Sequence, residues 1–192
     1  MKRSLITLAV AALCSVPIAA QAQGLGVLGG WSYGSVPSGS TSGQGSLSAN
    51  SGFAFGLGAE TGGPIGFGVN ALYAQRGFTS SLPGYSQKLS YIDVPMYLRV
   101  AIPNPVMTPF ALIGPQASFE LNCNASGTDC PSGRNKTTFD GIAALGLKFP
   151  MLSGLSVQGR YIYSLSNLDY GTVNNQSNYH QRSFMLLLGV GF

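Results

Sequence analysis

Beyond residue 22, the chain is dominated by short segments in which apolar side chains alternate with polar or small ones at a period of two. This alternation is typical of β-strands that present two different faces, whereas an amphipathic helix repeats every 3.6 residues. Eight segments carry the pattern, at about 24–33, 51–60, 64–78, 88–101, 109–120, 138–149, 155–166 and 182–192. The sequence therefore predicts an all-β fold.

The connections between these segments alternate strictly between short and long. The short ones are residues 61–63, 103–108 and 150–154. The longer, polar ones are residues 34–50, 79–87, 121–137 and 167–181. Barrels of the bacterial outer membrane have short periplasmic turns and longer extracellular loops. We therefore expect an eight-stranded antiparallel up-and-down transmembrane β-barrel, with both chain ends on the periplasmic side.

The distribution of charge decides which face of the barrel meets water. Only 8% of the residues are charged, against roughly 25% in a typical soluble domain. The charged strand residues fall on the Gly-rich, polar face: Glu60, Arg76, Asp93, Arg99, Glu120, Asp140, Lys148 and Arg160. The opposite face is almost uncharged and suits lipid, so these eight side chains should line the lumen. A lipocalin-like or avidin-like barrel, which is apolar inside and charged outside, is excluded.

The eight lumen charges comprise four of each sign, and buried charges are expected to pair. Strand order suggests the following pairs: Arg76 with Asp93, Asp140 with Arg160, and Glu60 with Arg99 or Lys148. Two interpretations stay open, a charged conduit or gate and a salt-bridged structural plug. The plug is favoured because an eight-stranded barrel is just wide enough for side chains to fill.

Glycine and proline carry separate expectations about the strands. The strand glycines, among them Gly68 and Gly146, should mostly face inward and leave room for large neighbours. Pro95, Pro109 and Pro115 interrupt strand patterns, and local bulges could absorb them.

Residues 1–22 have the features of a cleavable signal peptide. Lys2 and Arg3 precede an apolar stretch that begins at Leu5, and the small residues of Ala20-Gln21-Ala22 place cleavage after Ala22. A membrane anchor is the alternative, but the stretch is short for a spanning helix of about 20 residues. The mature barrel domain would be residues 23–192. It keeps 8 of the 10 basic residues against 6 acidic ones, a net charge of +2, with no basic cluster for nucleic acid.

The polar segment 122–136 contains two cysteines, Cys123 and Cys130. An exported protein meets an oxidising compartment, so we expect a disulfide that closes this loop. A zinc site would need four ligands, and the single histidine lies far away in the sequence. We expect no metal and no cofactor.

A lipid-modifying membrane enzyme could place Ser, His and an acid near the outer rim. His180, Ser183 and Asp169 are the candidates for such a triad. His180 and Ser183 would lie three apart on one strand and so on opposite faces, which is poor geometry for a dyad. We therefore expect no catalytic residue.

Several segments resemble the PorT-type family of outer-membrane β-barrel domains. The residues that carry the resemblance are Tyr73-Ala74-Gln75-Arg76-Gly77, Tyr91-Ile92-Asp93-Val94-Pro95, Pro109-Phe110 through Gly114-Pro115, Phe139-Asp140-Gly141, and Gly159 through Asn167. The resemblance covers residues 51–192 and implies an eight-stranded barrel related in architecture to OmpA and OmpX. The chain ends on Phe192, which resembles the aromatic signal that the outer-membrane assembly machinery reads. The Ser/Gly-rich loop at 34–50 and the cysteine loop depart from the pattern.

The family resemblance implies no single activity. We expect a non-enzymatic, monomeric integral protein of the outer membrane with a largely closed lumen and with surface loops for structural or interaction roles. Its expected partners are the lipid bilayer and the assembly machinery. A narrow porin-like channel for ions or small solutes is the first alternative, and an outer-membrane lipid-modifying enzyme is the more remote one.

Overall fold

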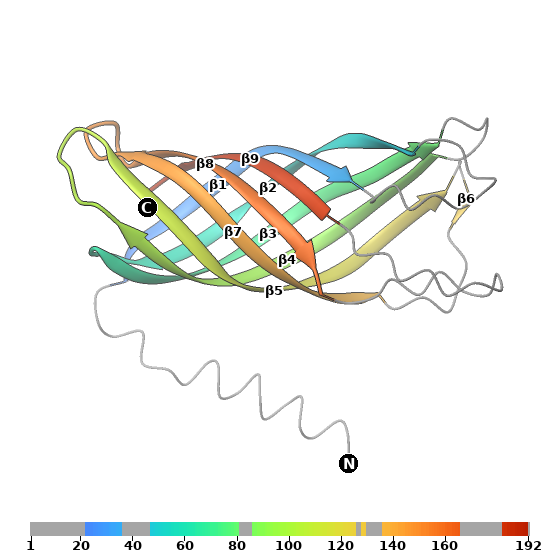
Figure 1. Ribbon diagram of the computed structural model, residues 1–192, viewed down its shortest axis with the longest axis horizontal. Helices are drawn as coiled ribbons and strands as arrows, with labels where there is room; N and C mark the ends of the chain where they lie inside the picture. Colours follow the sequence, from blue (N-terminus) through green and yellow to red (C-terminus); the bar gives the residue numbers. More distant parts are fainter. Residues whose placement is uncertain are drawn as a thin grey trace, which may run out of the picture.

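The computed structural model describes residues 22–35, 47–80, 86–125, 128–129, 136–165 and 182–191. These residues form a closed β-barrel (Figure 1). Its strands are β1 (Ala22–Ser35), β2 (Leu47–Thr61), β3 (Ile65–Ser80), β4 (Ser86–Ala101), β5 (Thr108–Ala125), β7 (Thr137–Phe149), β8 (Leu155–Ser164) and β9 (Arg182–Val190). The two-residue strand β6 (Thr128–Asp129) pairs with the end of β5.

The barrel is closed by pairing between the first and last strands. Each strand is antiparallel to its neighbours in the order β4-β3-β2-β1-β9-β8-β7-β5, and β5 pairs back to β4. The β1–β9 ladder runs from Val27 opposite Val190 to Ser35 opposite Arg182. The predicted eight-stranded antiparallel barrel is therefore confirmed. The predicted signal peptide lies almost wholly outside the described residues.

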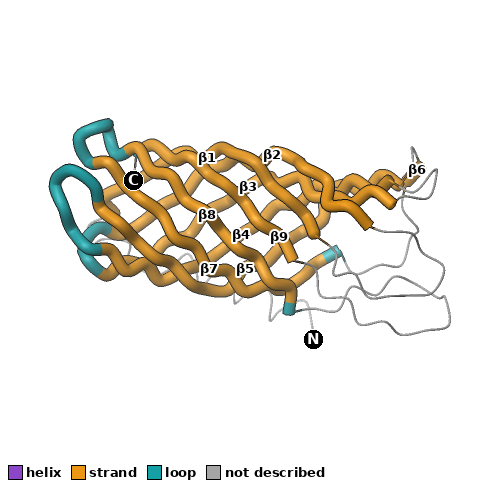
Figure 2. The backbone as a smooth tube through the Cα atoms, turned by 45° about the horizontal axis from the view of Figure 1, so that its top comes forward, coloured by secondary structure: helices purple, strands orange, loops and turns teal. Residues whose placement is uncertain are grey.

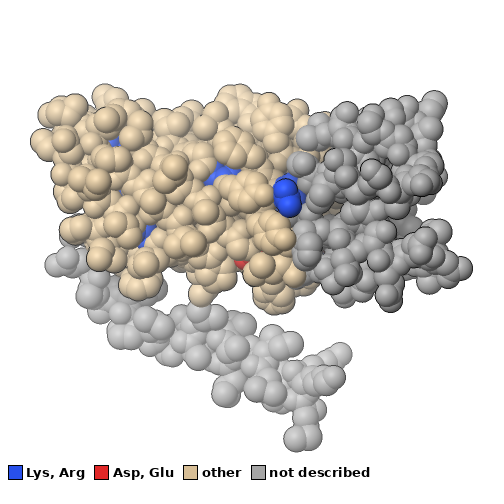
Figure 3. All heavy atoms as spheres, viewed as in Figure 1, with Lys and Arg blue, Asp and Glu red and all other residues tan. Residues whose placement is uncertain are grey.

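Side-chain burial alternates along the strands as the period of two predicts. In β9, Ser183, Met185 and Leu187 are buried, whereas Phe184 and Leu186 are exposed. Apolar side chains make up much of the exposed outer wall, and little charge shows on the coloured part of Figure 3. The barrel has an apolar outside and a polar inside, as a lipid-facing wall requires. Among the described residues, no helix is long and apolar enough to cross a membrane.

The strand prolines do not cause the bulges that we expected. The β3–β4 register is the same on both sides of Pro95, with Val69 opposite Met96 and Leu72 opposite Asp93. Pro115 likewise lies in an unbroken β5–β7 register. Proline removes one N–H donor from a ladder, and the strands here accept that loss without shifting register. The shift in the β4–β5 ladder falls instead between Ser90 and Tyr91.

Two inward glycines make room for aromatic rings, as predicted. A Cβ atom on Gly68 would lie 2.4 Å from the Tyr97 ring, and one on Gly146 would lie 2.3 Å from the Phe110 ring. Both distances are far below van der Waals contact. These glycines therefore allow large side chains to fill a narrow lumen.

Candidate functional site

The lumen is the candidate site because it gathers most of the charge of the barrel wall, with Lys88 and Arg182 as exposed exceptions. Arg76, Asp93, Arg99, Asp140 and Arg160 are buried in the interior. Glu60 and Lys148 are half-buried and line one cavity near the short turns. Glu120 is half-buried and lies opposite the buried Tyr91 in the β4–β5 ladder, which places it on the same inner face.

Arg76 and Asp93 form an ion pair near the long-loop end of the lumen. Arg76 Nη2 on β3 donates to Asp93 Oδ2 on β4, and both side chains are at most 2% exposed. The Arg76 guanidinium also lies over the Tyr91 ring, 5.1 Å from its centroid. The ion pair that the sequence suggested for these two residues is therefore present.

Asp140 does not pair with Arg160, so this expected pair is wrong. Asp140 lies opposite Ser164 and Arg160 opposite Ala144, four positions apart along the β7–β8 ladder, which is the same offset that Arg76 spans to reach Asp93 in the β3–β4 ladder. Asp140 Oδ2 instead accepts hydrogen bonds from Ser118 Oγ (2.7 Å) and Gln116 Nε2 (3.4 Å). Neutral polar side chains on β5 therefore stabilise this carboxylate.

Arg160 is fully buried at mid-lumen and is held by neutral groups. Its Nη2 donates to Gln158 Oε1 at 3.4 Å, and its guanidinium lies 6.0 Å from the Tyr97 ring centroid. With the Asn70 amide oxygen turned toward Arg160, Nη2 donates to it at 3.0 Å, and the Asn70 nitrogen donates to the Tyr97 hydroxyl at 3.1 Å. Three strands, β3, β4 and β8, thus contribute to one cluster.

Glu60 connects that cluster to the short-turn end. Glu60 Oε1 lies 2.8 Å from Arg99 Nε, and Glu60 Oε2 accepts from the Tyr97 hydroxyl at 3.3 Å. Of the two partners that the sequence suggested for Glu60, Arg99 makes the ion pair, and Lys148 lines the same cavity. The volume of the cavity is about 10 Å³, about enough for a single water molecule.

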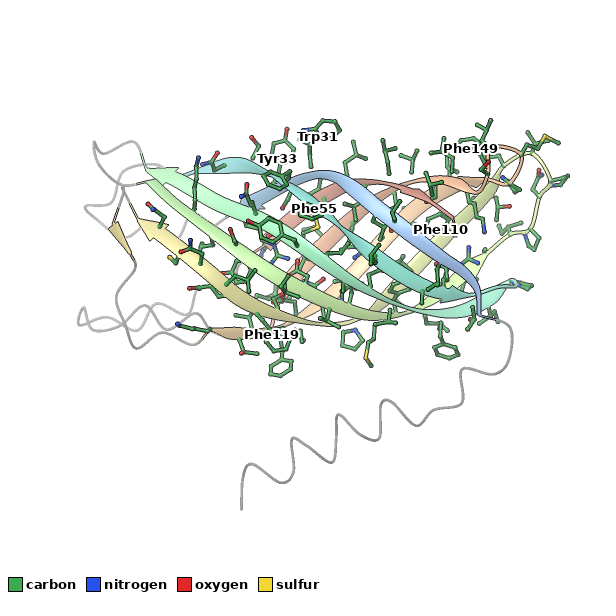
Figure 4. The ribbon with its side chains drawn as sticks, turned by 180° about the vertical axis from the view of Figure 1, so that it is seen from behind. Trp31, Tyr33, Phe55, Phe110, Phe119 and Phe149 are labelled. Atoms are coloured by element: carbon green, nitrogen blue, oxygen red, sulfur yellow. The ribbon has the colours of Figure 1, made fainter. Side chains whose placement is uncertain are left out.

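The lumen is therefore packed at its middle. Leu72, Met185 and Leu187 are fully buried beside the Tyr97–Arg160 cluster. In Figure 4, Phe110 lies inside the barrel, whereas Trp31, Tyr33 and Phe119 project from its outer surface. Such an arrangement can hold charges in place, and opening it would require side chains to move.

Neutral polar residues in the lumen were not identified as site residues from the sequence. They are Asn70, Tyr97, Gln116, Ser118 and Gln158, and they link the charged groups described above. The period of two in the sequence does place all five of them on the polar face of their strands. Their partners could not be inferred, because a partner depends on the register between strands.

The remaining predicted site residues are only partly described. Cys123 is buried next to Leu89 and Tyr91, but Cys130 lies outside the described residues, so the disulfide stays a prediction. Ser183 points into the lumen, whereas His180, Asp169 and Phe192 lie outside the described residues. Within the described ranges, no group of three or more His, Cys, Asp or Glu side chains is placed to hold a metal ion.

Comparison with known proteins gives a family and a fold. The family model "Outer membrane protein beta-barrel domain" matches residues 6–192. No protein of curated function matches the chain in sequence.

Three solved barrels are similar in structure, each with a TM-score of 0.51. Ail, the attachment invasion locus protein of Yersinia pestis, solved with the heparin analogue sucrose octasulfate, is 18% identical, and the match covers 88% of this chain and 99% of Ail. Neisserial surface protein A is 16% identical, with 88% and 96% covered. OprG from Pseudomonas aeruginosa is 12% identical, with 90% and 97% covered. At these identities the likeness concerns the fold.

Proposed function

The chain belongs to the outer membrane protein beta-barrel domain family, and we propose that it is a non-enzymatic barrel of the bacterial outer membrane with a closed lumen. The observation that carries this proposal is the packed middle of the lumen, where Arg160 is 0% exposed and the Tyr97 ring fills the space beside Gly68. The long loops would then carry the structural or interaction role.

The energetics of the lumen favour a fixed plug. Removing one partner of a buried ion pair leaves an uncompensated charge and costs about 3–5 kcal/mol. Arg76–Asp93 and Glu60–Arg99 are two such pairs, at different levels of the lumen. Opening a path would separate these paired charges, so the closed state should be stable.

Ion and solute flux into proteoliposomes tests the proposal. The refolded mature chain should pass neither small ions nor small sugars above the rate of empty vesicles. Tyr97→Ala should raise the ion flux, because it removes the ring that lies between Gly68 and Arg160. The matched control is Tyr161→Ala, which removes the same ring from the outer wall, where Tyr161 is 44% exposed. Ion flux through the unaltered protein would instead favour the narrow porin-like channel.

The enzyme hypothesis has its own test in the single histidine. His180→Ala should leave every activity of the protein unchanged. Loss of a lipase or acyltransferase activity on outer-membrane lipids in this variant would overturn the non-enzymatic proposal.

Four finer features belong to the same proposal. We propose cleavage after Ala22, a Cys123–Cys130 disulfide, a monomer in the membrane, and assembly through the machinery that reads Phe192. The PorT-type segments around Gln75, Asp93 and Arg160 support placing the chain closest to that group within the family. Alkylation of thiols before reduction tests the disulfide, since neither loop cysteine should react.

A further inference from the structure

Two of the short turns expose large apolar side chains and contain no charged residue. Residues 102–107 join β4 to β5, and residues 150–154 join β7 to β8. The exposed side chains are Ile102 (69%), Val106 (63%), Met107 (42%), Met151 (75%) and Leu152 (58%). We refer to these five residues as the apolar turn pair. A water-facing turn would be expected to be polar, so this surface needs an explanation.

Both turns are held by their own hydrogen bonds. Asn104 Oδ1 accepts from the backbone N–H of Val106 (2.9 Å) and of Met107 (3.3 Å). In the second turn, the N–H of Leu152 donates to the Phe149 carbonyl at 3.1 Å. Because these backbone groups are satisfied inside the turns, the apolar side chains are free to project outward.

The two turns are neighbours at one end of the barrel. Thr108 pairs with Lys148 in the β5–β7 ladder, so the turn before β5 and the turn after β7 leave the wall side by side. Figure 2 shows both as teal loops that extend beyond the strands at the same end. The third turn, between β2 and β3, is Gly62-Gly63-Pro64 and has no large apolar side chain. The apolar turn pair therefore lies on one side of the barrel.

The apolar turn pair continues the lipid-facing wall. The outward positions of β5 and its preceding turn are all apolar: Met107, Pro109, Ala111, Ile113, Pro115, Ala117 and Phe119. Phe119 lies at about the same level along the barrel as Trp31 and Tyr33 (Figure 4), where an aromatic girdle marks the outer interface. From Phe119 to Met107 the strand spans about 40 Å, or about 30 Å along the axis of a barrel with tilted strands.

The distance of about 30 Å along the axis from Phe119 to Met107 places the turns at the inner headgroup layer. The apolar band of such barrels is about 25 Å tall, so Met107 lies about 5 Å past its lower edge. The headgroup layer on each side of a bilayer is roughly 5–7 Å thick. The N–H of Ile102 donates to the Pro109 carbonyl at 3.0 Å, so Ile102 lies level with Pro109, at about the lower edge of the apolar band. Residues 103–106 form the tip of the turn and lie beyond that edge, in the headgroup layer.

We propose that the apolar turn pair inserts into the inner leaflet of the outer membrane, with phospholipid as its occupant. The continuity with the lipid-facing wall, the depth and the absence of charge all point to this contact. Because the turn between β2 and β3 lacks large apolar side chains, the contact is one-sided. It would hold the β4–β5–β7–β8 side of the barrel deeper in the membrane than the β1–β2–β3 side.

Tryptophan fluorescence can measure this contact directly, because the chain has a single tryptophan, Trp31. Val106→Trp and Met151→Trp would each be made in a Trp31→Phe background and refolded into phosphatidylcholine vesicles. Each variant would first be shown to be folded by its mobility shift between unboiled and boiled samples. Gly62→Trp in the same background is the matched control, since Gly62 is exposed in the turn between β2 and β3. The unaltered Trp31, in the girdle at the outer interface, gives the reference value for a tryptophan in interfacial contact with lipid.

We expect brominated phosphatidylcholine to quench both turn tryptophans at least half as strongly as Trp31, and aqueous acrylamide to quench them weakly. Gly62→Trp should be quenched strongly by acrylamide and weakly by brominated phosphatidylcholine. The proposal is overturned if acrylamide quenches Val106→Trp and Met151→Trp and brominated lipid does not, because the turns would then face water and await a protein partner. Equal lipid quenching at Gly62 would overturn the one-sided contact.

Discussion

The Tyr97 ring packs against the backbone of Gly68, which lies directly opposite it in the β3–β4 ladder. This contact lets an aromatic ring cross a lumen that would otherwise hold smaller side chains. The Tyr97 hydroxyl then reaches Glu60 on one side and Asn70 on the other. One glycine therefore determines whether the charged groups near the short turns connect with those at mid-lumen.

Gly68→Ala should destabilise the barrel, because the new methyl group would overlap the Tyr97 ring. Overpacking of this kind costs about 1–3 kcal/mol. The free energy of unfolding in urea, followed by Trp31 fluorescence in lipid vesicles, measures the cost. Gly29→Ala is the control, since a Cβ at Gly29 meets nothing within 4 Å. Equal stability of the two variants would contradict the packing of Tyr97 against Gly68.

Exchanging the charges of Arg76 and Asp93 should be tolerated better than changing either alone. Arg76→Asp or Asp93→Arg leaves two like charges buried together, and each should cost at least the 3–5 kcal/mol of a broken buried pair. The double exchange restores an ion pair and should recover most of that loss. A double variant as unstable as the single variants would show that the two side chains do not interact.

Glu60→Gln should lower stability because it removes the only acidic side chain among the residues that line the cavity with Arg99 and Lys148. The two cations would then repel each other without a counter-charge. Adding Lys148→Met to Glu60→Gln should restore part of the lost stability, as measured by the same urea titration. If Lys148→Met gives no recovery, the Lys148 charge does not act on this cluster.

Protein isolated from outer membranes should begin at Gln23. Intact-mass measurement would find a chain that lacks residues 1–22. A mass that includes those residues would point to an uncleaved anchor.

The fold was readable from the sequence because a period of two fixes which side chains share a face. The inward positions of Asp93 and Arg160 needed only that period. The partner of each lumen residue needed the register between strands, which alternation does not determine. The Arg76–Asp93 pair could be suggested because the two residues lie on adjacent strands, although Arg76 is opposite Leu89 and Asp93 is opposite Leu72, so the side chains meet across an offset of four positions. Asp140 and Arg160 have the same offset of four positions in the β7–β8 ladder, yet Asp140 accepts from Ser118 and Gln116 instead, so neither alternation nor strand order determines which charges meet.

The role of Tyr97 could not be inferred from the sequence either, because it also depends on the register between strands. Its position on the polar face was evident, but its place opposite Gly68 depends on how β3 and β4 align. The neutral residues Asn70 and Gln116 carry no charge that would suggest a partner, and their contacts come from β4 and β8 for Asn70 and from β7 for Gln116.

Single-channel recording tests the closed lumen most directly. The refolded mature chain, shown to be folded by its gel mobility, should give no discrete current steps across a range of voltages, and Tyr97→Ala should give steps that Tyr161→Ala does not. Discrete openings of the unaltered protein that change when Arg160 is neutralised would contradict the account and make the lumen charges part of a conducting path.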